Sequence, residues 1–240
     1  MTDRQTALVV GAGTGLGAAL ARCFAGSGMN VAVAARDPDR LSALVETLNA
    51  EGAKAVAVAC DATDEGSVRA LFDQMNESPG EPDVVVYNAG AFVPGSILDI
   101  APEEFERCWR IGCFGGFLVG QAAARRMVAR AERGDAGGTI VFSGATASLR
   151  GGARFANLAV GKFGLRALAQ SMARELGPRG VHVAHVIIDG MIAAGNSGEQ
   201  APADSRLEPD AIAANYLVLH HQPRSAWTHE LDLRPWMEKF

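Results

Sequence analysis

The chain has 240 residues, of which 48% are hydrophobic and 20% are charged, a composition typical of globular proteins and unlike that of disordered chains. Its formal net charge of −5 provides no basic surface for nucleic acid, and no apolar run approaches the roughly 20 residues that a membrane helix requires. We therefore expect one soluble domain, 1–240, that binds neither nucleic acid nor a membrane.

The N-terminus and the cysteines indicate a cytoplasmic location. The first five residues lead into a strand pattern, so we expect no secretory signal. The cysteines lie in apolar stretches without the CxxC or CxxH spacing of a zinc site, as expected of core residues in a reducing compartment. They are Cys23, Cys60, Cys108 and Cys113. We predict no metal site.

Short apolar runs alternate with helical patterns along the first half of the chain. Residues 7–10 are continuously apolar, as in a parallel strand that is buried on both faces. Comparable runs predict further strands at 31–35, 53–59 and 84–87. Helices are predicted between them at 18–25, from Pro38 to about 49, and at 65–76.

The second half continues this alternation. A long helical region is predicted from 102 to about 133, with a break near the glycines Gly112, Gly115 and Gly116. Further elements are predicted as strands at 138–143 and 181–188, helices at 155–176 and 210–220, and a final edge strand at 227–233. The segment 189–208 is rich in Gly, Ala and Ser and short on regular pattern, which predicts a mobile segment on the substrate side.

The order of these elements predicts the fold class. Six strand–helix units follow one another, and no linker divides them. Such a succession predicts an α/β protein, a single-domain doubly wound Rossmann fold with a mostly parallel sheet of about seven strands.

A glycine-rich loop, Gly11-Ala12-Gly13-Thr14-Gly15-Leu16-Gly17, joins the first strand to the first helix. Glycines allow a tight turn and bring backbone N–H groups against a pyrophosphate, while the helix N-terminus adds partial positive charge. The alternative is a glycine-rich turn without a ligand. The position between a buried strand and a helix favours a dinucleotide site.

The end of the second strand bears on which dinucleotide is bound. An acidic residue there would hydrogen-bond the adenosine ribose of NAD. The chain has Ala35-Arg36 instead, and a guanidinium suits the 2′-phosphate of NADP, with Arg40 one turn on as a second cation. Asp37 could still take the ribose role, and Arg36 could be a solvated turn residue. The sequence favours NADP(H) and leaves NAD(H) open.

Polar residues also follow the third and fourth strands. Asp61, with Ala62 beside it, is placed to accept a hydrogen bond from an adenine amino group. Asn88-Ala89-Gly90 would line the nucleotide. In this fold, ligands lie across the carboxyl ends of the strands at a topological switch point.

Together these motifs resemble the short-chain dehydrogenase/reductase family over essentially the whole chain. Residues 10–17 are similar to its TGxxxGxG motif, Tyr87-Asn88-Ala89-Gly90 to NNAG, and Ala159-Val160-Gly161-Lys162 to the lysine end of YxxxK. The resemblance implies an oxidoreductase that binds a nicotinamide dinucleotide. The expected cofactor site comprises Gly11, Gly13, Thr14, Gly15, Leu16, Gly17, Arg36, Asp61, Ala62, Asn88, Ala89, Gly90, Lys162 and Ile192.

The chain departs from the family at three of its four catalytic positions. Lys162 is retained, but Leu158 stands where the family has its tyrosine, Ala145 where it has its serine, and Gly112 where it has its asparagine. A leucine cannot donate the proton that a reduced ketone requires, a contribution of about 10²–10⁴-fold in rate. The resemblance therefore implies that binding of the cofactor is kept and that the usual acid is missing.

Other polar residues could replace the missing acid. The candidates in the loop of the fifth strand are Ser143, Thr146 and Ser148, and Asn157 is next to the vacant tyrosine position. Asp189 follows the sixth strand and should face the nicotinamide side. We retain Thr146 and Asp189 as speculative catalytic residues. The alternative for Asp189 is a turn or helix-cap role.

The remaining polar candidates favour structural roles. His182 and His185 lie in a predicted strand and are expected to be structural, and neither Tyr87 nor Tyr216 is a persuasive substitute for the tyrosine.

Three functions are consistent with these observations. The first is an NADP(H)-dependent oxidoreductase that acts on a small organic substrate by an atypical mechanism, such as C=N or activated C=C reduction. The second is a weakly active or inactive nucleotide-binding sensor or partner protein. The third is non-redox chemistry in the same pocket.

The C-terminal tail, 223–240, carries Trp227 and Trp236. Large aromatic side chains near a terminus need a cover. The resemblance implies that the tail packs at a subunit contact of a homodimer or homotetramer. Packing onto the chain's own core is the alternative.

Overall fold

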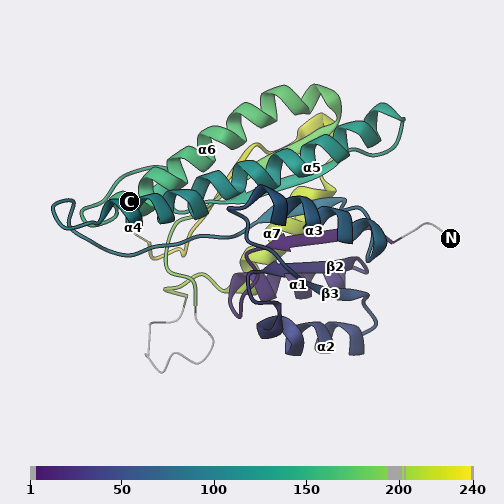
Figure 1. The fold of residues 1–240 in the computed structure, drawn as a ribbon, viewed down its shortest axis with the longest axis horizontal. Coiled ribbons are helices and arrows are strands. Elements are labelled where there is room, and N and C mark those ends of the chain that lie inside the picture. The colour runs from purple at the N-terminus through teal and green to yellow at the C-terminus, as the bar shows by residue number, and fades with distance from the viewer. Residues whose placement is uncertain (1–3, 194–201, 203, 239–240) are drawn as a thin grey trace.

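Seven strands form one parallel sheet in the computed structural model, which describes residues 4–193, 202 and 204–238 (Figure 1). The strand order is β3-β2-β1-β4-β5-β6-β7. The strands are β1 (Thr6–Val10), β2 (Asn30–Ala35), β3 (Ala55–Ala59), β4 (Val84–Tyr87), β5 (Gly138–Ser143), β6 (Val181–Ile188) and β7 (Glu230–Leu233). This confirms the predicted α/β Rossmann fold.

Helices cover both faces of the sheet, as Figure 1 shows. The helices α3 (Glu65–Glu77), α5 (Gly115–Glu132) and α6 (Ala156–Leu176) share one apolar core with the sheet. The helices α1 (Leu16–Gly26), α2 (Ser42–Ala50) and α7 (Pro209–His221) share the other. The remaining helix, α4 (Pro102–Trp109), precedes α5, and packs against α6.

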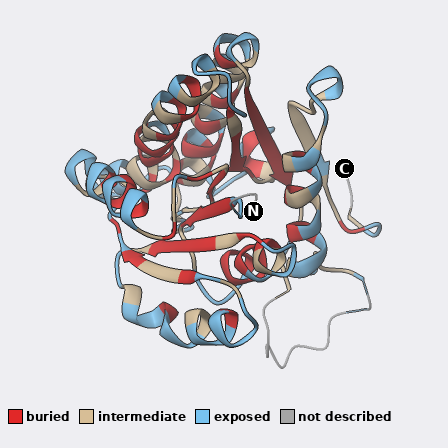
Figure 2. Cartoon of the chain, turned by 90° about the vertical axis from the view of Figure 1, so that its right-hand side faces the viewer, coloured by how far each residue is buried: buried red, intermediate tan, exposed pale blue. Residues whose placement is uncertain are grey.

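The central strands are buried on both faces (Figure 2). In β1, Leu8 and Val10 enter one core while Ala7 and Val9 enter the other. This two-sided burial explains why the strand is continuously apolar in the sequence and does not alternate. The glycine loop that follows β1 is thereby held at the carboxyl edge of a rigid sheet.

The break predicted in the long helical region is a single π-helical segment, Arg110–Phe114, between α4 and α5. The Tyr87 hydroxyl donates to the Ile111 carbonyl at 2.5 Å, so a buried side chain satisfies a backbone group inside the segment. A Cβ on Gly115 would lie 2.4 Å from the Tyr87 oxygen. Glycine is therefore required where the helix passes over this tyrosine.

Two strands begin two or more residues later than predicted. β3 begins at Ala55 and not at 53, because the Asn49 side chain bonds both the N–H and the carbonyl of Ala55 (2.8 and 3.0 Å) and ends the preceding turn there. β7 begins at Glu230 and not at 227. Trp227 leaves the strand direction because its ring stacks on His182, with centroids 4.8 Å apart and planes 3° apart.

The helix predicted from Pro38 begins with a 3-10 turn, Pro38–Leu41, before α2 starts at Ser42. After β6, Ile192 forms an isolated parallel bridge with Leu207. Of the segment predicted to be mobile, 189–208, residues 194–201 and 203 lie outside the described residues, so its mobility stays a prediction. In the described part of the chain, no helix combines the length and apolarity needed to cross a bilayer.

Candidate cofactor and active site

A cavity of about 700 Å³ lies at the carboxyl edge of the sheet, around the ends of β1, β2, β3 and β4. Its volume is within the range of about 300–1,000 Å³ usual for small-molecule sites. Its lining comes from many parts of the chain: Val10, Gly11, Ala12, Gly13, Thr14, Ala34, Ala35, Arg36, Asp37, Arg40, Leu41, Cys60, Asp61, Ala62, Thr63, Asn88, Ala89, Gly90, Ala91, Phe92, Arg107 and Ile111. Nine of the fourteen residues predicted for the cofactor site are among them.

The glycine loop closes one side of this cavity. Gly11 has a φ of +84°, and a Cβ there would lie 2.4 Å from the backbone nitrogen of Ala89. The two loops after β1 and β4 are therefore in backbone contact. Asn88 reinforces the contact, since its Nδ2 donates to the Gly11 carbonyl at 3.1 Å. This is the switch point of the sheet, where β4 follows β1 on the opposite side from β2.

The middle of the loop is suited to a pyrophosphate. No other described group accepts a hydrogen bond from the backbone N–H of Gly13, Thr14 or Gly15. A Cβ on Gly13 or Gly15 would meet nothing within 4 Å, so the loop presents bare backbone to open space. Helix α1 begins directly afterwards and adds the partial positive charge of its N-terminus. These residues fit a dinucleotide.

Five predicted cofactor residues do not line the cavity. Leu16 is buried in the core under the loop, and Gly17 packs on Ala12, to whose Cα an added Cβ would come within 2.7 Å. Gly15 caps α1. Ile192 lies in its bridge with Leu207, against the core. Lys162, the fourteenth, also lies outside the lining.

Arg36 presents a charged group to the adenosine end of the cavity. It is exposed, and its guanidinium has no hydrogen-bond or ion-pair partner within residues 4–193, 202 and 204–238. Arg40 differs, because its Nε pairs with the Asp37 carboxylate at 3.0 Å. Asp37, the alternative ribose ligand, is thus already engaged.

Asp61 is held in its charged form. Its Oδ1 accepts from the N–H and the hydroxyl of Thr63 at 2.9 and 2.8 Å. The pKa of this carboxyl is lowered first by the backbone bond, and the Arg36 and Arg110 charges act in the same direction. An ionised acceptor is thus available at the adenosine end.

Several groups that line the site were not predicted from the sequence. Arg107 of α4 enters the main cavity, and a second cavity of about 300 Å³ is lined by Arg36, Arg107 and Arg110 together with Glu103 and Glu106. The two cavities share five residues, so they are neighbouring spaces. Arg107 and Arg110 have ordinary helical spacing, so only the packing of α4 and the π segment brings them to these cavities.

Lys162 is buried in α6 beside the loop after β4. Its Nζ donates to the Ser143 carbonyl at 2.7 Å and would lie 3.7 Å from a Cβ on Gly90. Burial lowers the pKa of this ammonium to about 8. The lysine thus lies between the ends of β4 and β5, next to the predicted nucleotide-binding segment.

Leu158, Ala145 and Gly112, which the sequence comparison predicts at the family's other catalytic positions, do not line the cavity. Leu158 and Ala145 are both half-buried. A Cβ on Gly112 would lie 3.4 Å from the Cα of Gly161, so the π segment and α6 are close together there. Asn157 is turned away, since its Nδ2 donates to the Val93 carbonyl at 2.7 Å.

The structure brings the two speculative catalytic residues together. The Thr146 hydroxyl donates to Asp189 Oδ1 at 2.5 Å, and Arg234 from the C-terminal tail lies 3.4 Å from Asp189 Oδ2. Asp189 is only 4% exposed, and neither residue lines the cavity. The carboxylate links three segments that are far apart in sequence.

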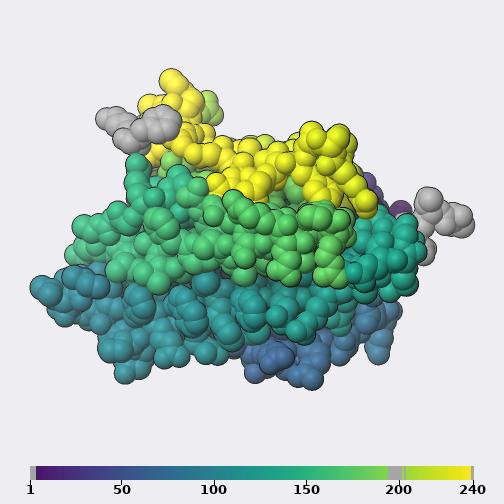
Figure 3. Space-filling view, turned by 90° about the horizontal axis from the view of Figure 1, so that it is seen from above, coloured from purple at the N-terminus to yellow at the C-terminus, as the bar shows by residue number. Residues whose placement is uncertain are grey.

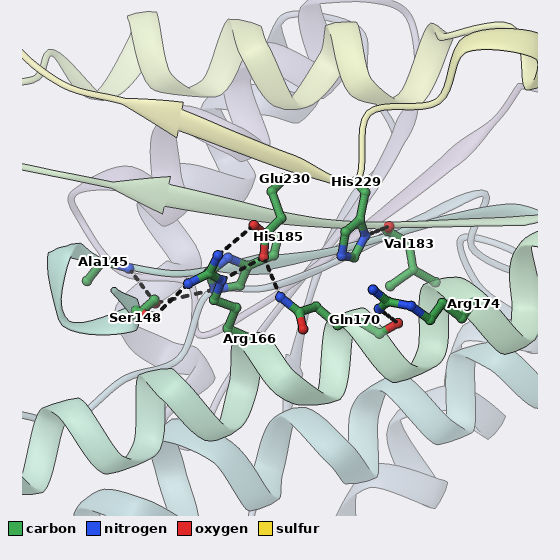
Figure 4. A network of polar contacts seen from close by, with 9 residues as sticks. All are labelled: Ala145, Ser148, Arg166, Gln170, Arg174, Val183, His185, His229 and Glu230. Carbon is green, nitrogen blue, oxygen red and sulfur yellow. Dashed lines mark hydrogen bonds and ion pairs between the residues drawn. The ribbon is translucent and has the colours of Figure 1, made fainter. Parts of the chain in front are cut away.

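A polar network lies behind the loop that contains Ala145 (Figure 4). The Ser148 hydroxyl accepts from the Ala145 N–H at 3.1 Å and lies 3.4 Å from His185 Nε2. Arg166 forms a two-point pair with Glu230 of β7 at 2.7 and 2.8 Å and lies 3.5 Å from the Ser148 carbonyl. The network therefore connects β7, through α6, to the loop at the active site.

The two candidate histidines are structural in their surroundings. His185 is fully buried beneath Gly144, and burial is the main reason that its pKa falls to about 4. His182 stacks on Trp227, and its Nε2 lies 2.8 Å from the Thr228 carbonyl. Neither lines the cavity.

Neither tyrosine is free to act as an acid at the cofactor. Tyr87 donates to Ile111, and Tyr216 of α7 shares a hydrogen bond of 2.8 Å with the Ser143 hydroxyl. Burial raises the pKa of both phenols.

Comparison with known proteins gives concordant matches. Residues 5–204 match the family model described as short chain dehydrogenase. Trans-4-hydroxycyclohexanecarboxylate dehydrogenase of Sinomonas cyclohexanicum is 35% identical over 185 residues, 75% of this chain and 69% of that protein. Versicolorin reductase 1 of Dothistroma septosporum is 32% identical over 183 residues, 75% of this chain and 67% of that protein.

Solved structures are similar over nearly the whole chain. A short-chain dehydrogenase from Rhodopseudomonas palustris is 40% identical with a TM-score of 0.83, covering 97% of this chain and 99% of that one. A metagenomic short-chain oxidoreductase in complex with NADP is 29% identical with a TM-score of 0.83, covering 98% of each chain.

Proposed function

Because the chain belongs to the short-chain dehydrogenase/reductase family, and is therefore an oxidoreductase with a nucleotide-binding Rossmann fold, we propose that it uses NADP(H) to reduce a small organic substrate without a tyrosine acid. One observation carries the reaction class. Leu158, four residues before Lys162, places an apolar side chain at the family's acid position. Such a site suits a substrate that needs no enzymic proton where the hydride arrives.

The preference for NADP(H) is supported by charge at the adenosine end. The Arg36 guanidinium lines the cavity without a protein partner among the described residues, while Asp37 is paired with Arg40. A phosphate that carries two negative charges is the natural partner of an unpaired guanidinium. The similar oxidoreductase solved with NADP is consistent with this choice.

The nicotinamide supplies a hydride, which is two electrons and one proton equivalent, to a carbon of the substrate. An iminium C=N carbon that accepts it becomes a neutral amine, and the charge balances with no further proton. An activated C=C accepts it at the β-carbon and takes one proton from water. The chain's part would be to hold and orient the reactants. Lys162, whose Nζ would lie 3.7 Å from a Cβ on Gly90, is our candidate for binding the ribose, and the Thr146 hydroxyl is bonded to Asp189.

The proposal is tested by fluorescence titration with NADPH and NADH, followed by turnover assays on matched ketones, cyclic iminium ions and enones. Tighter binding of NADPH with turnover of iminium or enone substrates supports it. Rapid turnover of simple ketones overturns the reaction class, and tighter binding of NADH overturns the cofactor. Tight NADPH binding with no consumption across the panel would favour a sensor or partner protein.

We further propose a cytoplasmic homodimer or homotetramer. The four cysteines are free, as expected in a reducing compartment. Trp236 and Met237 of the tail are 79% and 46% exposed, which is unusual for a monomer surface. Trp227, by contrast, packs on the chain's own His182.

A further inference from the structure

An exposed aromatic pair stands at the end of the cofactor cavity. Phe92 lines the cavity after the Asn88-Ala89-Gly90 segment, and its ring stacks on Phe155, with centroids 4.7 Å apart and planes 29° apart. The two residues are 40% and 41% exposed. Each of these two phenyl rings therefore leaves apolar surface on which a further ring can stack.

The pair is held in place by hydrogen bonds between its two loops. Asn157 Nδ2 donates to the Val93 carbonyl at 2.7 Å, and the Gly95 N–H donates to the Arg154 carbonyl at 3.2 Å. Arg154 has a φ of +69°, a conformation that is unfavourable for a residue with a Cβ. Such strain is retained where surrounding contacts fix it, often at a ligand site. Here it directs the chain into α6 directly before Phe155.

Two polar side chains of the neighbouring loops are already bonded within the protein. Leu158 follows Phe155 by one helical turn and is half-buried. The nearest amide, Asn157, is engaged with Val93, and the Thr146 hydroxyl is engaged with Asp189. The stacked rings of Phe92 and Phe155 thus form an aromatic surface that adjoins the cavity at Phe92.

We propose that Phe92 and Phe155 bind a flat, conjugated ring of the substrate by stacking, and so select planar aromatic substrates over saturated ones of the same size. This rests on the proposed function, because it places the substrate beside the cofactor cavity. A reducible bond conjugated to that ring lies next to the cofactor without needing a hydrogen bond to orient it. The ring itself supplies the orientation.

The test measures binding without turnover. The full-length protein, saturated with NADP⁺, is titrated with naphthalene-2-carboxylate and with trans-decahydronaphthalene-2-carboxylate, which share size and charge but not planarity. We expect the aromatic ligand to bind about threefold to tenfold more tightly, the range for an added aromatic contact. Equal affinities, or no binding of either ligand, would overturn the proposal.

Variants then assign the preference to the pair. Phe92→Leu and Phe155→Leu are each expected to remove most of it, while the affinity of the saturated ligand changes little. Phe163→Leu is the matched control, since Phe163 is 43% exposed on α6 and does not line the cavity. An unchanged preference in both variants, or equal weakening for both ligands, would contradict stacking. NADP⁺ titration of each variant verifies the fold.

The outcome is separable from that of the proposed function. Aromatic preference without any turnover would leave the stacking site standing and remove the reductase. Turnover of iminium or enone substrates with no aromatic preference would support the reductase and reject the stacking site.

Discussion

Arg36 bears on the choice of cofactor through a single side chain. Replacing it by glutamine keeps a polar side chain but removes the charge that would meet a 2′-phosphate. We expect the Kd for NADPH to rise about 10- to 100-fold in Arg36→Gln, from the usual 1.5–3 kcal/mol of a charged hydrogen bond. Calorimetric titration with NADPH and NADH measures the change, and the Kd for NADH should remain nearly the same.

Arg40→Gln is the control, because the Arg40 guanidinium is already paired with Asp37. Its effect on NADPH binding should be smaller than that of Arg36→Gln. Equal losses for NADPH and NADH in the Arg36 variant would indicate a general role in the loop and not phosphate recognition.

Leu158 and Ala145 can be converted together to the family's residues. In Leu158→Tyr with Ala145→Ser, Lys162 lies one helical turn from the new phenol and favours its ionised form. We expect ketone reduction to increase by about 10²–10⁴-fold over the starting protein. Initial rates with NADPH and a simple ketone, measured across pH, provide the test. No gain in a folded, NADPH-binding variant would indicate that Gly112 or Asp189 has reshaped the site.

Lys162 makes stability depend on pH in a defined direction. Its pKa is lowered from 10.5 to about 8, so between these values the folded chain binds fewer protons than the unfolded one. Stability therefore rises with pH across this window, and the cost of the buried charge is full below about pH 8. The stability of Lys162→Met relative to the unaltered protein should fall by about 3 kcal/mol from pH 7 to 10.5.

Urea unfolding of the cofactor-free protein at both pH values measures this difference. Lys54→Met is the control, because Lys54 is exposed and its substitution should shift stability equally at both values. A pH-independent difference for Lys162→Met would show that the ammonium is not desolvated.

At the scale of elements, the pair of Arg166 and Glu230 connects α6 to the edge strand β7. The pKa of Glu230 falls to about 2, first because of its hydrogen bond from Arg166. A lowered carboxyl pKa stabilises the fold above the ordinary value of 4.5, and this contribution is lost as pH falls towards 2. Glu230→Gln should cost about 1 kcal/mol at neutral pH, and less at low pH.

Denaturant unfolding at neutral pH and near pH 3 follows this loss. Asp210→Asn serves as the comparison, because it breaks an exposed ion pair with Arg22. The side chain of Asp210 is 77% exposed and that of Arg22 is 44% exposed. Its cost should be below about 0.5 kcal/mol at either pH. If Glu230→Gln cost no more than Asp210→Asn, the network behind Ala145 would not hold β7 in place.

At the scale of the whole molecule, the exposed tail bears on assembly. Figure 3 shows C-terminal residues lying over the surface formed by α6. We expect the molar mass measured by light scattering after size-exclusion chromatography to be that of a dimer or tetramer. In Trp236→Ser we expect this molar mass to be lower. Val218→Ser, at a 60% exposed position on α7, is the control. A monomer at all concentrations would contradict the assembly.

The sequence predicted those features that depend on neighbouring residues. The buried strands, the glycine loop and the helix break each carry a local pattern, and each was found within a few residues of its expected place. The contacts that shape the candidate site are between segments far apart in the chain. Thr146 meets Asp189 across 43 positions, Phe155 meets Phe92 across more than sixty, and Arg107 reaches the cavity only through the placement of α4. No periodicity reports such contacts.

The hydrogen bond from Tyr87 to Ile111 also sets the rotational phase of the long helix. A π turn accommodates one extra residue, and each residue of an α-helix advances by about 100°. Side chains beyond Phe114 are therefore turned by that angle relative to an uninterrupted helix. The N-terminal part can present Arg107 and Ile111 to the nucleotide while the C-terminal part presents Val119 and Ala123 to the core. One continuous helical region can therefore direct side chains to the cavity at its N-terminal end and to the core at its C-terminal end.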